Sequence, residues 1–288
     1  MTNSVACVTM VYNEPEYLPI WMGYYGSQVG ASNCFLVDHG SEDGSTSLPY
    51  GANTVTLPRS PQDEVRRVQI MSDYCKSLLK HYQVVIYTDV DEILVPNPTK
   101  FSGLEAFCKT MTADTVTAVG LNVHHMVGLE AAFDRALSVL EQRCWVRFVS
   151  PMCKPLVTRV PTKWGRGFHS CDRPLNLGDI FLFHLRYYDL TVGLTRLSRT
   201  RALARKTESD VRSAQHQRMA DDAFLGLMQT VSAMDKVAPE VLSSESEPVR
   251  SWLKKAATSD SGEMLAQVRM DVFANTLWKI PAIFRGIF

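Results

Sequence analysis

The segment QVVIYTDVDEILVP, residues 83–96, decides how this 288-residue chain folds. Residues 84–87 are β-branched and aromatic, which predicts a short strand buried on both faces. Two aspartates and a glutamate follow this strand directly. Side chains two positions apart in an extended chain share a face, so we expect Asp89 and Asp91 to point the same way. Glu92 is expected to point the other way and only to brace the loop.

The two aspartates predict a divalent-cation site. Two carboxylates on one face repel each other and need a positive partner. Magnesium and manganese take one or two carboxylates and fill their remaining positions with water and substrate phosphates. Open α/β sheets also bind ligands at the carboxyl ends of their strands, where Asp89 and Asp91 lie. The alternative is that acids end strands simply because the chain returns to water.

The composition is that of a globular protein, with 45% hydrophobic and 21% charged residues. Thirty basic side chains balance thirty acidic ones, so no global field attracts nucleic acid. Seven scattered cysteines without a Cys-x-x-Cys pair suit a reducing compartment, and Cys7, Cys34 and Cys75 lie in apolar runs that predict a core position. Residues 1–4 carry no basic region and no apolar run approaches a membrane span, so we expect a cytoplasmic protein.

The first third of the chain alternates between strand and helix patterns. Strands are predicted at residues 5–11, 34–37, 54–58 and 84–87, and helices at 16–29 and 61–80. Strand, helix, strand, strand, helix, strand is the order of a Rossmann-like half-domain with parallel strands. The fold class predicted is therefore α/β.

Beyond Pro96 the predicted strands and helices no longer alternate regularly. We expect helices at residues 103–111 and 130–141, and strands at 115–123, 145–149, 154–160 and 180–184. From residue 189 the chain is expected to be helical. We therefore predict a catalytic domain over 1–188, with a nucleotide half at 1–96 and an acceptor half at 97–188, followed by a helical C-terminal appendage at 189–288.

Three motifs follow one another along the predicted strands: VYNE at residues 11–14, VDHGSEDGS at 37–45 and DVD at 89–91. Their order resembles the family 2 glycosyltransferases of the GT-A fold, in particular the small branch with late histidines, over roughly the first two-thirds of the chain. The resemblance implies a Mn²⁺- or Mg²⁺-dependent, inverting transfer of a sugar from a nucleotide-diphosphate-sugar, with a UDP-sugar favoured. A glycan or lipid-linked acceptor is implied, as in bacterial-type glycan or glycolipid synthesis.

The resemblance also implies roles for residues of the first half. Asn13 and Glu14 would line the base and ribose pocket, and Asp38 would accept a hydrogen bond from the base edge. Asp91 would be the direct metal ligand, while Asp89 would bind the ribose or a metal-bound water. Asp38 could instead be a simple turn-forming residue.

Basic residues and histidines are expected to complete the site. Arg66 or Arg67 would reach the diphosphate, unless they form a solvated helix face. His184 would complete the metal shell or hold the β-phosphate, with a backbone-bonded histidine at a strand end as the alternative. Lys154, His169 and His184 match places where the small branch carries basic residues and histidines, and His169, in a glycine-rich loop, is a candidate contact to acceptor or phosphate.

An inverting transfer needs a general base near the acceptor hydroxyl. Asp172, three residues after His169, is the choice from the sequence, with Glu130 and Asp222 as rivals. His124, His125 and His216 are expected to be structural.

Two segments, one basic and one aromatic, have a composition that also occurs in membrane-binding surfaces. Arg196, Arg199, Arg201, Arg205 and Lys206 crowd one predicted helical segment, which we interpret as a solvated face rather than a patch for anionic lipid or an acidic acceptor. The aromatic tail at residues 273–288 is expected to dock on its own domain, with peripheral contact at the inner membrane face as the alternative.

Two other functions stay open at this point. One is a catalytically inactive glycosyltransferase-like binding or scaffold protein, which we expect to have lost the aspartate pair. The other is a sugar nucleotidyltransferase, which needs a glycine-rich, arginine-containing loop after the first strand. The sequence YNEP at residues 12–15 is not such a loop.

Overall fold

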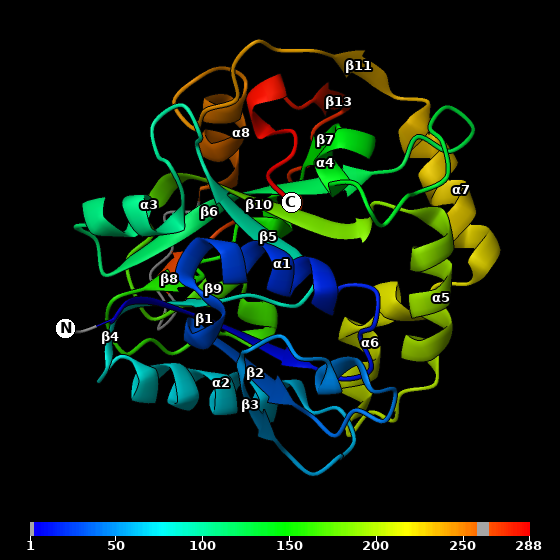
Figure 1. Ribbon diagram of the computed structural model, residues 1–288. Helices are drawn as coiled ribbons and strands as arrows, with labels where there is room; N and C mark the ends of the chain where they lie inside the picture. The colour runs from blue at the N-terminus through cyan, green and yellow to red at the C-terminus, as the bar shows by residue number, and fades with distance from the viewer. Residues whose placement is uncertain (1–2, 258–264) are drawn as a thin grey trace.

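A central mixed sheet of eleven strands, flanked by helices, organises the computed structural model, which describes residues 3–257 and 265–288 (Figure 1). The order of the longest path is β11-β13-β7-β6-β8-β4-β1-β2-β3; off this path β10 pairs with β6, and β5 pairs with β10. The predicted α/β class is confirmed.

The first half is built as the sequence predicts. Its elements are β1 (Asn3–Val11), α1 (Leu18–Val29), β2 (Cys34–Asp38), β3 (Asn53–Thr56), α2 (Glu64–Leu78) and β4 (Tyr82–Tyr87). The four strands are parallel in the order β3-β2-β1-β4, which brings the ends of β1 and β4 side by side. Cys7, Cys34 and Cys75 are buried in the core, as expected.

Helix α1 fixes the segment that follows β4. The indole of Trp21 donates to the Thr88 hydroxyl at 2.8 Å in the buried core. The Tyr24 hydroxyl donates to the carbonyl oxygen of Leu94 at 2.7 Å, and the Leu94 N–H donates to the Tyr25 hydroxyl at 2.9 Å. These bonds hold both sides of the Asp89–Glu92 segment against one rigid helix.

The middle of the chain adds β5 (Glu92–Pro96), α3 (Leu104–Thr110), β6 (Thr115–His124), α4 (Val139–Gln142), β7 (Trp145–Phe148), β8 (Val157–Thr158), β9 (Ser170–Cys171) and β10 (Leu177–Tyr187). Strand β10 lies between β5, to which it is antiparallel, and β6, to which it is parallel. Its register places His184 opposite Glu92 on one side and Asn122 on the other.

Two predicted elements in this region are wrong. Residues 130–138 are loop rather than helix, and the Gln142 side chain bonds the loop backbone at Asp134. The predicted strand 154–160 shrinks to β8, because Lys154 turns into the protein interior to reach Glu92 and prolines lie at 155 and 161.

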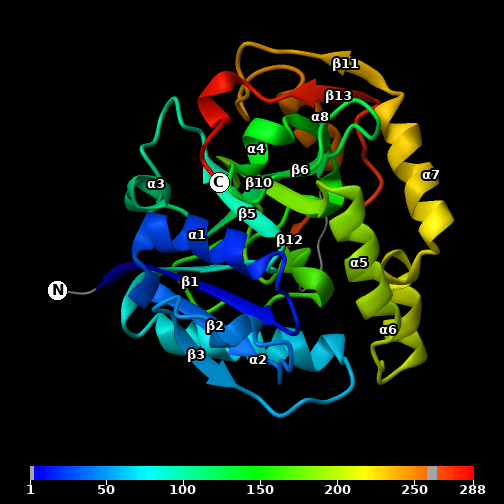
Figure 2. The same cartoon turned by 45° about the vertical axis from the view of Figure 1, so that its right-hand side comes forward.

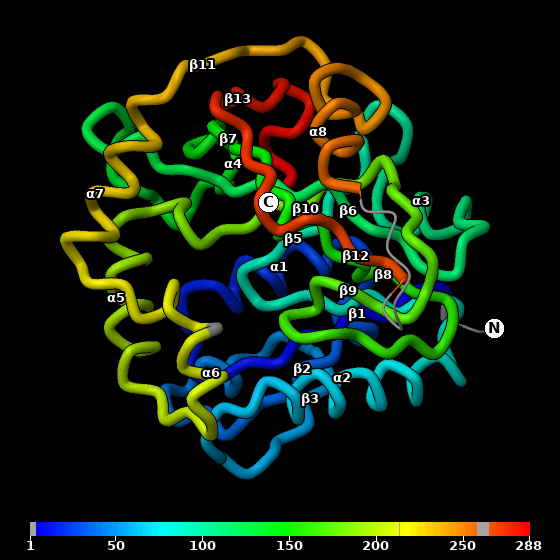
Figure 3. The backbone as a smooth tube through the Cα atoms, turned by 180° about the vertical axis from the view of Figure 1, so that it is seen from behind, coloured from blue at the N-terminus to red at the C-terminus, as the bar shows by residue number. Residues whose placement is uncertain are grey.

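The C-terminal segment supplies helices α5 (Leu190–Arg201), α6 (Glu208–Ser213), α7 (Asp221–Ser232) and α8 (Val249–Ala256), as expected. It also supplies three strands that were not predicted, β11 (Asp235–Val237), β12 (Ala266–Gln267) and β13 (Thr276–Lys279). Strand β13 pairs with β7 and β12 pairs with β9, so this segment is joined to the rest of the fold (Figure 3). Part of the predicted appendage, residues 258–264, lies outside the described residues.

The aromatic tail docks on its own domain, as expected. Phe284 packs against Phe181 and Phe183 of β10, and Phe288 packs against Phe183 and Tyr24. Among the described residues, no helix combines the length and apolar character that crossing a bilayer requires. Helices α5, α6 and α7 form a column beside the ends of β1 and β10 (Figure 2). Side chains from this column line the cavity described below.

Candidate functional site

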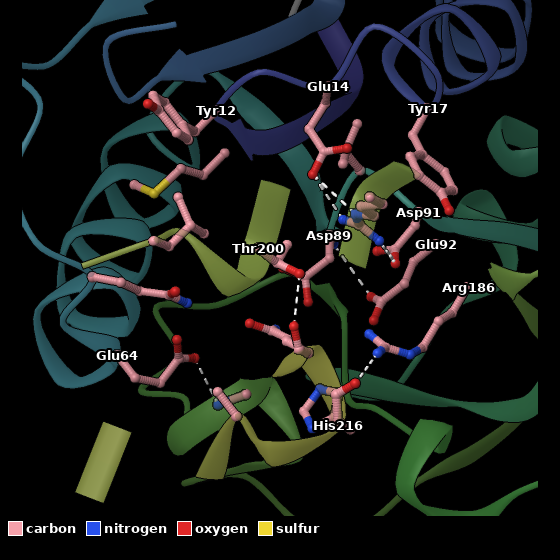
Figure 4. A pocket seen from close by; sticks show the side chains of 18 of the residues that line it. Tyr12, Glu14, Tyr17, Glu64, Asp89, Asp91, Glu92, Arg186, Thr200 and His216 are labelled. Carbon is pink, nitrogen blue, oxygen red and sulfur yellow. Dashed lines mark hydrogen bonds and ion pairs between the residues drawn. The ribbon is translucent and has the colours of Figure 1, made fainter. Parts of the chain in front are cut away.

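A cavity of about 750 Å³ lies at the carboxyl ends of β1 and β4. Its lining combines the end of β1, the Asp89–Glu92 segment, the start of α2, the end of β10, and the inner face of α5 with the short helix Gln215–Arg218. Figure 4 shows the carboxylates of Glu14, Asp89, Asp91 and Glu92 gathered together there. The cavity is where parallel α/β sheets bind their ligands.

The acidic segment is a turn and not an extended chain. The Glu92 N–H donates to the Asp89 carbonyl at 3.0 Å, and Glu92 begins strand β5. The expectation that Glu92 points away is therefore wrong, because it lines the same cavity as both aspartates. Its expected bracing role is confirmed, since its carboxylate accepts the Asp89 backbone N–H at 3.2 Å.

Asp89 is enclosed by donors. Its carboxylate accepts from Arg67 at 2.6 Å, from the Tyr87 hydroxyl at 3.0 Å and from Lys154 at 3.3 Å. Burial alone would raise the pKa of this carboxyl, but the charges of Arg67 and Lys154 outweigh it and hold the pKa well below its usual value. Asp89 is therefore ionised and bound to three protein donors.

Lys154 connects Asp89 to Glu92. Its ammonium lies 2.5 Å from the Glu92 carboxylate, and both residues are buried. Burial raises the pKa of Glu92, with Lys154 opposing the shift and the nearby aspartates adding to it. Loss of Glu92 would leave Lys154 with Asp89 as its remaining carboxylate, and loss of Lys154 would leave Glu92 buried beside two other acids.

Asp91 faces the second half of the chain. Its carboxylate oxygen lies 3.3 Å from Nε2 of His184. Nδ1 of His184 is 2.8 Å from the side-chain oxygen of Asn122, so the ring lies between Asn122 and Asp91 with one nitrogen toward each. Burial, only partly offset by Asp91, lowers the pKa of His184, so the ring is neutral near pH 7.

These two side chains fit a hard or borderline divalent cation. A carboxylate oxygen and an oriented neutral imidazole nitrogen are ligands that manganese accepts, and Asn122 is the kind of partner that fixes a ligating imidazole. Among the described residues, no group of three or more His, Cys, Asp or Glu side chains is placed to hold a metal ion. Any cation there would therefore depend on oxygens from substrate or water.

Arg196 of α5 also reaches the carboxylates. Its guanidinium bonds Asp91 and, at 2.9 and 3.1 Å, Glu14, and it lies 4.4 Å from the centre of the Tyr17 ring. The interpretation of Arg196 as part of a solvated face is wrong. Helical periodicity could not distinguish an inward arginine from an outward one, because both suit the polar stripe of an amphipathic helix.

The loop after β2 is bound to the end of β1. Asn13, with a positive φ of 52°, accepts from the Glu42 N–H at 2.8 Å and donates its own N–H to the Ser41 hydroxyl at 3.1 Å. Asn13 and Glu14 line the cavity as expected. Asp38 is buried, and its carboxylate accepts from the Ser41 N–H and the Thr46 hydroxyl within its own loop.

Two arginines near this loop have different positions. Arg67 lines the cavity, whereas Arg66 is exposed, bonds the Ser60 hydroxyl and does not line it. Arg59 lies 3.6 Å from the centre of the Tyr12 ring and 3.0 Å from His39 Nδ1, at the rim where a planar ring could stack.

The catalytic candidates from the late loops are separated. His169 lines the cavity, and its Nδ1 is 2.7 Å from the Pro151 carbonyl, so Nδ1 is the donor. Burial lowers the pKa of His169 to about 3, which makes it a weak base. Asp172 does not line the cavity and accepts the Lys163 N–H at 2.9 Å.

The rival bases and the other histidines are also placed. Glu130 accepts the Met126 N–H, Asp222 is exposed on α7, and neither lines the cavity. His124 is buried at the end of β6, beside β10. His216 lines the cavity, although it was expected to be a structural histidine. No sequence pattern marks His216, because it lies in the short helix Gln215–Arg218, which is less than two turns long and shows no periodicity.

Comparisons with known proteins give partial likenesses only. No family model matches the chain, and no curated protein matches it. Similar solved structures include the mannosyltransferase PcManGT from Pyrobaculum calidifontis in complex with GDP-Man and Mn²⁺, at 18% identity and a TM-score of 0.29 over 40% of this chain and 35% of that one. A mycobacterial protein is similar at 14% identity and a TM-score of 0.31, covering 44% of each chain. S. aureus TarS is similar at 12% identity and a TM-score of 0.35 over 79% of this chain and 43% of that one. This chain spans less than half the length of each of these proteins, and TM-scores this low assign no function.

Proposed function

We propose that this protein is a metal-dependent glycosyltransferase that takes its sugar from a nucleotide-diphosphate-sugar. The observation that carries the proposal is the meeting of Asp91 and His184, 3.3 Å apart, from two halves of the chain at the carboxyl ends of the sheet. The order of the three motifs, resembling family 2 glycosyltransferases, supports it independently.

Asp91 and His184 would hold the cation. A divalent ion bound there would stabilise the negative charge that develops on a departing nucleoside diphosphate. Arg196 must then exchange Asp91 for another partner, and a diphosphate oxygen is the partner its planar fork suits best. Asp89 serves chiefly to hold Arg67 and Lys154 in place, since its own oxygens accept from both.

The nucleotide would lie toward β1 and β2. Asn13 and Glu14 line that side of the cavity, and the Tyr12 ring offers a stacking surface once Arg59 moves aside. Asp38 would act from behind, by shaping the loop through its bonds to Ser41 and Thr46. His169 is proposed as a substrate contact, and Asp172 receives no catalytic role.

Thermal unfolding with UDP, GDP and Mn²⁺, alone and combined, tests the proposal. If a cation joins the nucleotide to Asp91 and His184, nucleotide and metal together stabilise the fold by more than the sum of their separate effects. UDP-sugars and GDP-sugars are then assayed for release of the nucleoside diphosphate. Additive or absent stabilisation by every pair would contradict the proposal.

A second function is favoured by one observation. Arg196 already neutralises Asp91 and Glu14, as expected of a glycosyltransferase-like binding protein that works without a cation. Such a protein would bind a nucleotide equally well after chelator treatment and would release no nucleoside diphosphate from any nucleotide-sugar.

A further inference from the structure

Arg186 is a buried arginine with few partners. It lies near the end of β10, two residues after His184, and both side chains line the cavity. Only 8% of Arg186 is exposed. One nitrogen donates to the His216 carbonyl, a bond drawn in Figure 4, and Nε is buried with no acceptor among the described residues. No carboxylate of a described residue lies within 4.0 Å of its guanidinium.

Arg143 shows how the same fold treats a structural arginine. It is 1% exposed, and its guanidinium donates to the carbonyls of Tyr188, Ala131 and Gln142 and to the Asp189 carboxylate at 3.1 Å. Every side of Arg143 therefore meets an acceptor, and one of these acceptors carries a negative charge.

The difference between the two arginines has a physical cost. A buried charge without a counter-ion and a buried N–H without an acceptor both destabilise the fold. A guanidinium cannot release its proton to avoid this cost. The surroundings of Arg186 add no negative charge at contact distance, since its neighbours on this wall are His184, His216 and the Tyr187 ring at 5.7 Å. Because Arg186 lines the cavity, a ligand bound there could supply the missing acceptor and negative charge.

We propose that Arg186 is the centre of an anion subsite that binds a phosphate or carboxylate group of the substrate. This inference rests on the proposed function only in taking the cavity as the substrate site. Because β10 carries His184 and Arg186 on the cavity side, the anion would lie beside the Asp91–His184 pair. It belongs either to the diphosphate of the donor or to an acidic acceptor, such as a sugar phosphate or a uronic acid.

The subsite is tested by titrating the full chain with inorganic phosphate and measuring the heat of binding by calorimetry. We expect R186Q to weaken phosphate binding by at least about tenfold, because a charge-assisted, forked interaction is lost. R186K keeps the positive charge but lacks the planar guanidinium that can donate two parallel hydrogen bonds, so we expect an intermediate loss of phosphate affinity. R166Q is the matched control, because Arg166 also lines the cavity but is paired with Asp210 at 2.6 Å, and its phosphate affinity should stay close to that of the wild type.

Equal phosphate affinity in R186Q and the wild type would overturn the subsite, as would a wild-type protein that binds no phosphate. If R186Q does not fold, R186K decides by the same criterion. Repeating the titration with saturating UDP and Mn²⁺ separates the sources, and both outcomes support the subsite: phosphate that still binds points to the acceptor, and phosphate that is displaced points to the donor. If UDP and Mn²⁺ never bind while phosphate binding still depends on Arg186, the proposed function fails and the subsite stands.

Discussion

Asp89 and Asp91 lie two residues apart in one turn, yet their partners come from different parts of the molecule. Arg67 and Tyr87, which bind Asp89, belong to α2 and β4 of the Rossmann-like half, and Lys154 closes the group from the segment before β8. The partners of Asp91 are His184 of β10 and Arg196 of α5, both from later in the chain.

The difference indicates that Asp89 has a structural role and that Asp91 has a role in binding the ligand. Asp89 has two cations and a hydroxyl within hydrogen-bond distance, so protein partners fix its position, although its side chain is more exposed than that of Asp91. Asp91 faces an imidazole nitrogen of His184 and an arginine on a helix that forms the cavity wall. Asp91 is thus the point where the two halves of the chain form one site.

The largest expected effect is that of D91N on activity. This variant keeps the size of the side chain but removes the charge that would hold the cation, so release of nucleoside diphosphate should fall on the order of 10³-fold. Stopped assays with the preferred nucleotide-sugar measure it. D73N, an exposed change on α2, is the control for loss of one negative charge. Undiminished turnover in D91N would remove Asp91 from the mechanism.

D89N should act on stability instead. It removes one negative charge from a largely buried network and leaves Arg67 with Glu64 and Lys154 with Glu92 as their remaining carboxylates, so we expect the free energy of unfolding to fall by about 2–3 kcal/mol. Urea unfolding measures it, and Mn²⁺ affinity should change less than in D91N. An unchanged unfolding midpoint together with lost metal affinity would reverse the roles assigned to the two aspartates.

The sequence predicts these two aspartates but not the difference between them. Residues 84–87 and the helices on either side follow simple periodicity, so the strand and the position of the acids could be predicted. The chain turns directly after β4, which places Glu92 in the cavity against the expectation from strand alternation. Arg196 and Arg186 are long-range partners, and local sequence pattern contains no information on which polar side chain points inward.

A smaller effect is expected when Arg196 is removed. R196Q takes away the cation that competes for Asp91, so Mn²⁺ affinity should rise by about tenfold, or about 1.4 kcal/mol. R201Q is the control, because Arg201 lies on the same helix but bonds Asp221 and the Met219 carbonyl. Calorimetry with Mn²⁺ compares the two. Equal affinities in both variants would show that Arg196 does not compete with the metal.

The smallest effect concerns acid stability on the Asp91 side, where His124 of β6 stacks on Tyr187 of β10 at 5.2 Å. Burial, followed by the charges of Arg147 and His184, lowers the pKa of His124 to about 3. The unfolded chain takes up this proton near pH 6.5 while the native chain does not, so the stabilising contribution is complete above that pH and is lost as the pH falls.

H124F keeps an aromatic ring on Tyr187 and removes the titration. We expect the fall in the free energy of unfolding between pH 7 and pH 6 to be about 0.7 kcal/mol smaller in H124F than in the wild type. Urea unfolding at the two pH values measures it. Parallel pH dependence in both proteins would show that His124 is protonated equally in the folded and unfolded states.

The central claim is that Asp91 and His184 bind one cation from two halves of the chain. Electron spin echo modulation of Mn²⁺, bound in the presence of UDP, detects a directly coordinated histidine nitrogen. We expect a nitrogen coupling in the wild type that persists in H169Q and disappears in H184Q. A bound Mn²⁺ without any nitrogen coupling in the wild type, or with a coupling that survives in H184Q, would contradict the account.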